Sequence, residues 1–145
     1  MAQVVHRPRT VQTSDQRPCV LVVDDDPVTR DTLRQLLGDA GYDVQTAEDG
    51  AAALGALDRG ERWPDLVLLD MRMPFMDGPT FFECLRSRPE SRRTPVVIVS
   101  GTLRSSVRGE VSGIQIVKKP FDAMKLLDLV NAMVHRPVED ISYRN

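Results

Sequence analysis

Short aliphatic runs alternate with helical patterns through the central part of this chain. Five runs stand out, at residues 20–23, 43–46, 66–69, 96–99 and 114–117, of which the second is the least apolar. Val and Ile dominate them, which is typical of strands that are covered on both faces in a parallel sheet. The alternation predicts an α/β fold with a doubly wound, five-stranded parallel sheet.

The segments between the runs predict helices. Pro27 suits the first helical turn after run one, and Gly41 ends the apolar repeat that follows. Further helices are expected at 50–59, at 79–88, and from Asp122 as an N-cap to about His135. The connection at 101–113 is rich in Ser and Gly and barely reaches the dozen residues that a parallel crossover needs, so we expect a short fourth crossover helix.

The last predicted helix has two apolar stripes, which is more apolar surface than one sheet contact needs. One stripe consists of Leu127, Val130 and Val134. The other, formed by Leu126, Leu129 and Met133, predicts either additional core or a surface for a downstream protein partner.

The length and composition limit the number of domains, the classes of partner and the cellular compartment that are expected for this chain. Its 145 residues allow one domain, expected at 18–136 between flexible tails at 1–17 and 137–145. Nineteen basic against 21 acidic residues argue against direct binding of nucleic acid, and no apolar run approaches the roughly 20 residues of a membrane helix. Cys19 and Cys84 lack the spacing of a zinc site or a disulfide framework, which favours the cytoplasm.

Polar residues follow the predicted strands at the edge where α/β proteins bind ligands. They are Asp24, Asp25 and Asp26 after run one, Asp70 after run three, Ser100 after run four and Lys119 after run five. Carboxylates about 4 Å apart repel by about 4 kcal/mol at an effective dielectric of about 20, so such a group must take up protons or a cation. Oxygen ligands without Cys or His favour Mg²⁺ or Mn²⁺. Together with a lysine and a hydroxyl, this set is typical of phosphoryl transfer, in which an aspartate can be the nucleophile.

Four segments carry a family resemblance. They read VLVVDDDP at 20–27, LLDMRMPFMDG at 68–78, VIVSG at 97–101 and KKPF at 118–121. In this order they resemble the motifs of response-regulator receiver domains of two-component signalling. The resemblance implies a flavodoxin-like (βα)5 fold.

The resemblance also implies an acceptor and a metal site. Asp70 matches the aspartate that takes a phosphoryl group from a sensor histidine kinase or a phosphotransfer protein. Asp25 and Asp70 would ligate Mg²⁺ directly, Asp24 would act through a bound water, and the backbone carbonyl of Arg72 would be a further ligand.

Two more positions match the switch machinery of that family. Ser100 matches the hydroxyl that turns toward the phosphoryl group, and Lys119 matches the lysine that contacts it. The bond between Lys119 and Pro120 is often cis in such domains.

Three departures from the pattern bear on output. Ile116 stands where the family usually has an aromatic residue, and the fourth crossover is shorter than usual. Asp26 and Arg72 occupy variable positions, and we expect them to pair across the site and restrict water.

The sequence leaves three functions open. The first is a stand-alone, single-domain response regulator, which is a switch with weak autophosphatase activity rather than an enzyme and signals by protein contact or phosphorelay. The second is a pseudo-receiver that binds partners without phosphorylation. The third is a haloacid-dehalogenase-like phosphatase, because residues 22–28 also fit its motif, with Asp24 as nucleophile and Asp26 as acid/base.

Overall fold

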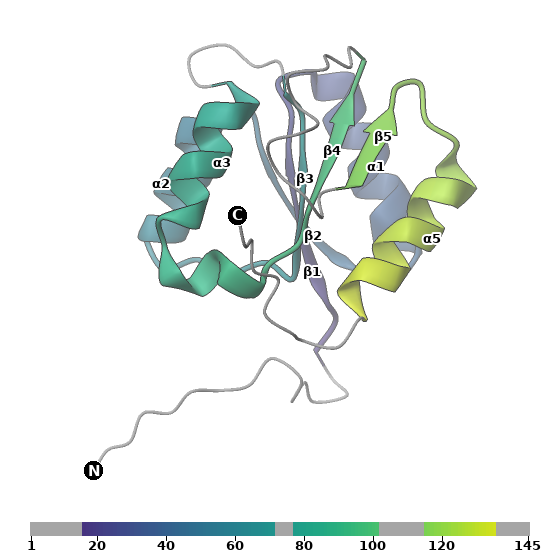
Figure 1. Cartoon of the computed structure of the whole chain (residues 1–145). Helices are drawn as coiled ribbons and strands as arrows, with labels where there is room; N and C mark the ends of the chain where they lie inside the picture. Colours follow the sequence, from purple (N-terminus) through teal and green to yellow (C-terminus); the bar gives the residue numbers. More distant parts are fainter. Residues whose placement is uncertain (1–15, 72–76, 102–114, 136–145) are drawn as a thin grey trace.

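The computed structural model of the chain describes residues 16–71, 77–101 and 115–135. They form one parallel sheet with the strand order β2-β1-β3-β4-β5, flanked by helices on both faces (Figure 1). The strands are β1 (Cys19–Val23), β2 (Asp43–Ala47), β3 (Leu66–Leu69), β4 (Val96–Ser100) and β5 (Gln115–Lys118). The helices are α1 (Pro27–Asp39), α2 (Gly50–Asp58), α3 (Gly78–Arg86), the short 3₁₀ helix η1 (Pro89–Arg93) and α5 (Ala123–Val134). The predicted doubly wound α/β fold is confirmed.

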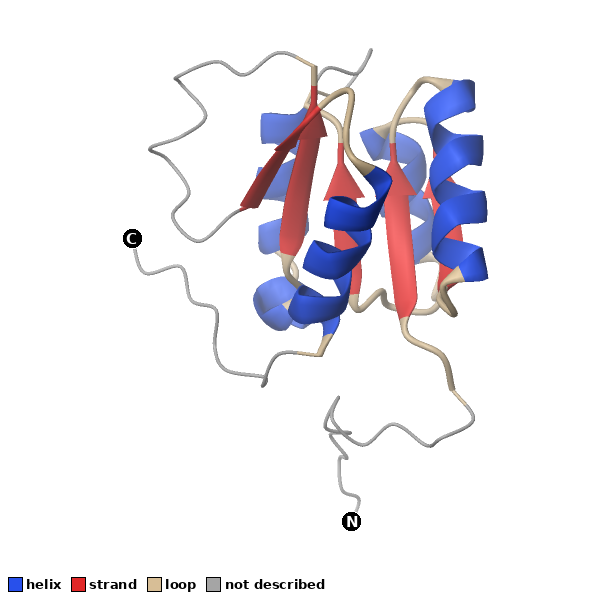
Figure 2. Cartoon of the chain, turned by 90° about the vertical axis from the view of Figure 1, so that its right-hand side faces the viewer, coloured by secondary structure: helices blue, strands red, loops and turns tan. Residues whose placement is uncertain are grey.

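Two hydrophobic cores lie on opposite faces of the sheet. The first joins α1 and α5 to one set of strand side chains, and the second joins α2 and α3 to the other set. In Figure 2, α5 and α1 lie in front of the sheet and the other helices behind it. Every residue of β1, β3 and β4 is buried, because side chains alternate between the two covered faces. Polar chemistry is therefore confined to the strand ends.

Aspartate caps begin the four α-helices of the described residues. Asp122 accepts hydrogen bonds from the amides of Met124 and Lys125, which confirms it as the N-cap of α5. Asp26, Asp49 and Asp77 cap α1, α2 and α3 in the same way. Such a cap satisfies amides that have no partner within the first turn of the helix.

The end of α1 is also as predicted. The helix stops at Asp39, and Gly41 follows with φ of 102°. Glycine adopts this left-handed conformation without the steric cost that a Cβ would add.

The second stripe of α5 belongs to the core. Leu126 is 1% exposed, Met133 is 7% exposed, and Leu129 packs against the same cluster. Both stripes are covered because α5 contacts the sheet while it shares a core with α1. Of the two alternatives for Leu126, Leu129 and Met133, additional core is therefore confirmed and a partner surface is wrong.

Several expectations fall on residues outside the described part of the chain. They concern the fourth crossover helix, Ile114 at the start of the fifth run, the C-terminal tail and most of the N-terminal tail. Among the described residues, no helix has the length and apolar character needed to cross a membrane.

Candidate functional site

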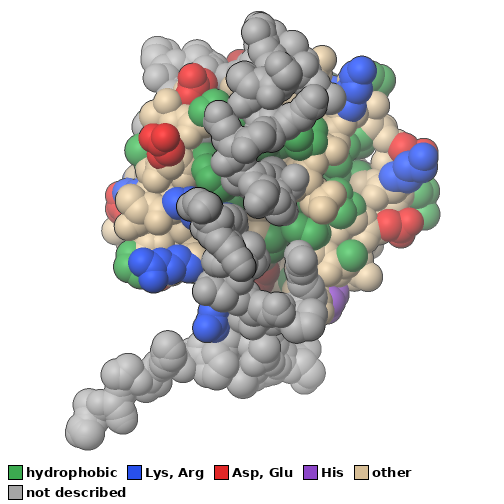
Figure 3. All heavy atoms as spheres, in the orientation of Figure 1, with side chains coloured by type: hydrophobic (Ala, Val, Ile, Leu, Met, Phe, Trp, Pro, Cys, Tyr) green, Lys and Arg blue, Asp and Glu red, His purple; other side chains and the backbone are tan. Residues whose placement is uncertain are grey.

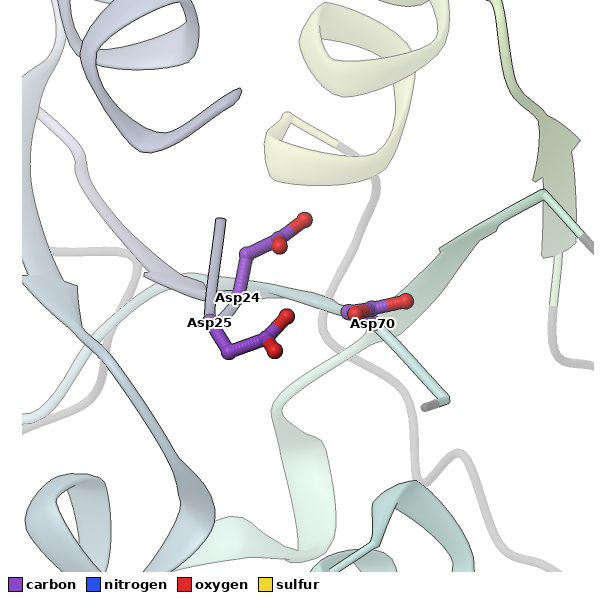
Figure 4. A group of neighbouring side chains, drawn as sticks. All are labelled: Asp24, Asp25 and Asp70. Carbon is purple, nitrogen blue, oxygen red and sulfur yellow. The ribbon is translucent and has the colours of Figure 1, made fainter. Parts of the chain in front are cut away.

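Three carboxylates meet at the carboxyl end of the sheet. Asp24 follows β1 and Asp70 follows β3, and these two strands are paired neighbours with Val23 opposite Leu69. Asp24, Asp25 and Asp70 each offer an oxygen within 4.8 Å of the others (Figure 4). The sheet order thus brings together carboxylates that lie far apart in the sequence.

Asp24 is held at every polar atom. It is 2% exposed, and its amide donates to the carbonyl of Ala47 at 3.1 Å. Its Oδ1 accepts the amide of Asp26 at 2.9 Å, and its Oδ2 accepts Lys119 Nζ at 2.9 Å. Its backbone carbonyl accepts Arg30 Nη1 at 2.8 Å. With both carboxylate oxygens already bonded, Asp24 is suited to orient the site, and Asp25, which is exposed, is open to a ligand.

Lys119 is the ammonium group of the site. Its Nζ lies 2.9 Å from Asp24 Oδ2 and 3.9 Å from Asp70 Oδ1. Its amide donates to the carbonyl of Ser100 at 2.9 Å, which ties the end of β5 to the end of β4. The bond to Pro120 is cis, as the resemblance implied.

Ser100 is the last residue of β4, and its carbonyl accepts the amide of Lys119. It is 1% exposed and pairs in register with Lys118, the residue before Lys119. Because β4 lies between β3 and β5, Ser100 stands on the strand between those that present Asp70 and Lys119. The four strand ends named by the sequence are therefore neighbours.

Asp26 is a helix cap, and this bears on its expected role as an acid/base. Its Oδ2 accepts the hydroxyl of Thr29 at 2.8 Å and its Oδ1 accepts the amide of Val28 at 3.2 Å. These hydrogen bonds, that of Thr29 first, lower the pKa of Asp26. A carboxylate held ionised is a poor general acid, which argues against the phosphatase reading. Arg72 lies outside the described residues, and with it the expected pair between Asp26 and Arg72 and the expected metal ligand from the Arg72 carbonyl.

The charge balance of the site fits a divalent cation. Among the described residues, the three carboxylates Asp24, Asp25 and Asp70 and the one ammonium of Lys119 give a formal charge of −3 + 1 = −2. Two of the carboxylates, Asp24 and Asp70, are buried, where the repulsion is less screened than in water. A group of this size that offers only oxygen donors suits Mg²⁺, and Asp24, Asp25 and Asp70 are the residues that could hold it.

Arg30 was missed by the sequence analysis. It lies one turn inside α1 and reaches back to the end of β1. Nothing in the pattern distinguishes it from other polar residues of an amphipathic helix, because the contact depends on the angle at which α1 leaves the strand.

Comparison with known protein families agrees with this geometry. The model for the response regulator receiver domain matches residues 20–131. The chain belongs to the response-regulator receiver domain family. Receiver domains are signalling switches that are phosphorylated on an aspartate, interact with histidine kinases or phosphotransfer proteins, and bind Mg²⁺ at an acidic pocket.

Similar curated proteins are transcriptional and response regulators. Response regulator MprA of Mycolicibacterium vanbaalenii is 38% identical over 128 residues, covering 83% of this chain and 52% of that protein. The DNA-binding dual master transcriptional regulator RpaA of Synechocystis is 35% identical over 122 residues, covering 82% and 50%. This receiver chain spans about half the length of the curated relatives it matches.

Solved structures give the same fold. Chemotaxis protein CheY4 of Vibrio cholerae superposes with a TM-score of 0.73 at 29% identity, covering 81% of this chain and 98% of that one. A response regulator receiver protein from Pseudomonas putida gives 0.73 at 31% identity, covering 79% and 96%.

Proposed function

We propose that this receiver domain accepts a phosphoryl group on Asp70, from a phosphohistidine of a sensor histidine kinase or phosphotransfer protein, in a Mg²⁺-dependent reaction. The observation that supports this most directly is the group of three carboxylates within 4.8 Å of one another, with Lys119 Nζ 3.9 Å from Asp70 Oδ1. A nucleophilic carboxylate, a cationic side chain and carboxylate oxygens that could bind a metal are the components that phosphoryl transfer requires.

Each residue of the site has a role in the proposed reaction. An Asp70 carboxylate oxygen attacks phosphorus, the new O–P bond forms as the P–N bond breaks, and the imidazole leaves with the electron pair and takes up a proton. Lys119 stabilises the charge on the phosphoryl oxygens, and Asp24 holds the Lys119 ammonium in place at 2.9 Å. Mg²⁺, when bound by Asp25 and Asp70, supplies further neutralisation of that charge.

Ser100 and slow hydrolysis complete the switch. The Ser100 hydroxyl donates to a phosphoryl oxygen once the group is attached to Asp70. The acyl phosphate is then lost slowly to water, so the domain acts as a switch with weak autophosphatase activity rather than as an enzyme.

The domain signals in the cytoplasm through a protein partner or by passing the phosphoryl group onward. A net charge of −2 disfavours direct contact with nucleic acid by this domain. Both signs of charge are interspersed over the described surface on the face shown in Figure 3, with no extended basic field on that face.

Intact mass spectrometry tests the proposal. The protein is incubated with a small acyl-phosphate donor with and without Mg²⁺, alongside Asp70→Asn and Asp24→Asn. We expect one phosphoryl adduct in the native sequence that needs Mg²⁺ and is absent from Asp70→Asn. An adduct that survives in Asp70→Asn and is lost in Asp24→Asn would support the phosphatase reading instead. Mg²⁺ binding without any adduct would support the pseudo-receiver, which the substitution of the usual aromatic by Ile116 favours.

A further inference from the structure

Arg30 connects helix α1 to the acidic turn at the end of β1. Its Nη1 donates to the backbone carbonyl of Asp24 at 2.8 Å, and the contact is partly buried. Within the described residues, Arg30 forms no ion pair with a carboxylate, so its contact with the site passes through this carbonyl.

The Asp24 carbonyl belongs to the peptide group that joins Asp24 to Asp25. Because the peptide group is planar and includes the Asp25 Cα, fixing its carbonyl oxygen fixes the orientation of the plane in which the Asp25 Cα lies. In the described part of the chain, no hydrogen bond or ion pair holds the Asp25 carboxylate, which is exposed. Its position relative to Asp24 and Asp70 therefore depends on the backbone.

Asp24 itself does not depend on Arg30 in this way. Its amide, Oδ1 and Oδ2 are bonded to Ala47, Asp26 and Lys119, respectively. Removing the Arg30 side chain leaves these three contacts in place. The peptide group between Asp24 and Asp25 would lose its hydrogen bond, and the Asp25 carboxylate would be less well oriented.

We propose that Arg30 is a positioning residue: by holding the Asp24 carbonyl, it orients the Asp25 carboxylate to bind Mg²⁺. The inference rests on the proposed Mg²⁺ site. Removal of groups that orient metal ligands from outside the coordination sphere typically lowers metal affinity by about 10- to 100-fold. We expect a value near the lower end, about tenfold, because the contact acts through the backbone.

Isothermal titration of the full chain with Mg²⁺ measures this effect. Arg30→Met removes the donor and keeps the aliphatic part of the side chain, and Arg30→Lys keeps a cationic donor. The matched control is Arg34→Met, one turn further along α1, where Nη2 donates to Thr46 Oγ1 at 3.0 Å, away from the acidic turn. We expect about tenfold weaker Mg²⁺ binding in Arg30→Met, partial rescue in Arg30→Lys and native affinity in Arg34→Met.

A second readout separates positioning from a general loss of structure. If Arg30 acts on the metal site alone, the phosphorylation rate of Arg30→Met returns to the native rate at saturating Mg²⁺, and its thermal unfolding without Mg²⁺ stays close to native. Three results would overturn this inference and leave the proposed function standing. They are native Mg²⁺ affinity in Arg30→Met, an equal loss of affinity in Arg34→Met, and a phosphorylation rate of Arg30→Met that saturating Mg²⁺ does not restore. Failure of the native chain to bind Mg²⁺ would overturn the proposed function and the inference with it.

Discussion

Two clusters of charged residues lie at opposite ends of the same sheet and differ in their balance of positive and negative charge. The cluster at the carboxyl ends of the strands has three carboxylates and one ammonium: Asp24, Asp25, Asp70 and Lys119. The cluster at the amino ends has two carboxylates and two guanidinium groups: Asp43, Asp65, Arg17 and Arg62. The second cluster is neutral by itself, and the first is not.

This difference separates a structural role from a functional one. At the amino ends, Arg62 Nη1 lies 3.1 Å from Asp43, and its Nη2 donates to the carbonyl of Arg17 at 2.6 Å, so the cluster ties the entry of β1 to β2. At the carboxyl ends, the excess of negative charge costs stability until a cation binds. Functional sites commonly retain such destabilising features because the ligand requires them.

Removing the ammonium group should produce the largest effect. In Lys119→Met, Asp24 and Asp70 lose the ammonium group that lies 2.9 and 3.9 Å from their oxygens, and we expect phosphorylation to slow by about 100-fold. The free energy of unfolding without Mg²⁺ should fall by about 2–3 kcal/mol, since the partner Asp24 is buried and Lys119 is a quarter exposed. Time-resolved mass spectrometry and denaturant titration measure the two effects. The neighbouring exposed Lys118, changed to Met, is the control, and equal behaviour of the two variants would contradict the role of Lys119.

Neutralising one carboxylate at each end should change stability in opposite directions. Asp25→Asn relieves repulsion and should raise the free energy of unfolding without Mg²⁺ by about 1 kcal/mol. Asp43→Asn removes an ion-pair partner and should lower it by less than about 1 kcal/mol.

Adding Mg²⁺ sharpens this contrast. At about 100 times its dissociation constant, Mg²⁺ should stabilise the native chain and Asp43→Asn by about 2.7 kcal/mol, and Asp25→Asn by much less. Thermal unfolding with and without Mg²⁺ measures all three. Equal stabilisation of the two variants would remove the distinction between the clusters.

Alkaline pH should destabilise the fold through Cys19, the first residue of β1, whose pKa is affected by the cluster at the amino ends. Burial raises the pKa of the Cys19 thiol from its ordinary value of 9.0 to about 11, an effect that Arg62 opposes and Asp65 supports. The folded state therefore holds this proton more tightly, so the associated stability is intact below pH 9 and is lost as the pH rises to about 11. The loss should be on the order of 2 kcal/mol.

Comparison with Cys19→Val isolates the contribution of the thiol. Burial also raises the pKa of Tyr42, but that residue is present in both proteins, so its effect cancels in the difference. Denaturant unfolding between neutral and strongly alkaline pH should show a shallower loss in the variant. Parallel curves for the two proteins would show that Cys19 makes no such contribution.

Much of the fold could be predicted because its signals are local. Aliphatic runs mark the strands, Asp122 and Pro27 mark helix starts, and Gly41 marks a helix end. The site could be predicted in outline because parallel strands end at one edge, which brings Asp70 to Asp24.

What could not be predicted depends on angles between elements. Burial of Leu126 and Met133 depends on how α5 packs beside α1 on the same face of the sheet. The bond from Arg30 to Asp24 depends on the direction in which α1 leaves β1. The 3₁₀ helix η1 is too short to leave a periodic pattern in the sequence.

The central claim is that the phosphoryl group is transferred to Asp70, in the cluster at the carboxyl ends of the strands. Borohydride reduces an aspartyl phosphate to homoserine, which marks the acceptor permanently for peptide sequencing by mass spectrometry. After reaction with an acyl-phosphate donor and Mg²⁺, we expect homoserine at position 70 alone, and none when Mg²⁺ is omitted. Homoserine at the position of Asp24 or Asp25, or marking at position 70 that does not need Mg²⁺, would contradict the account.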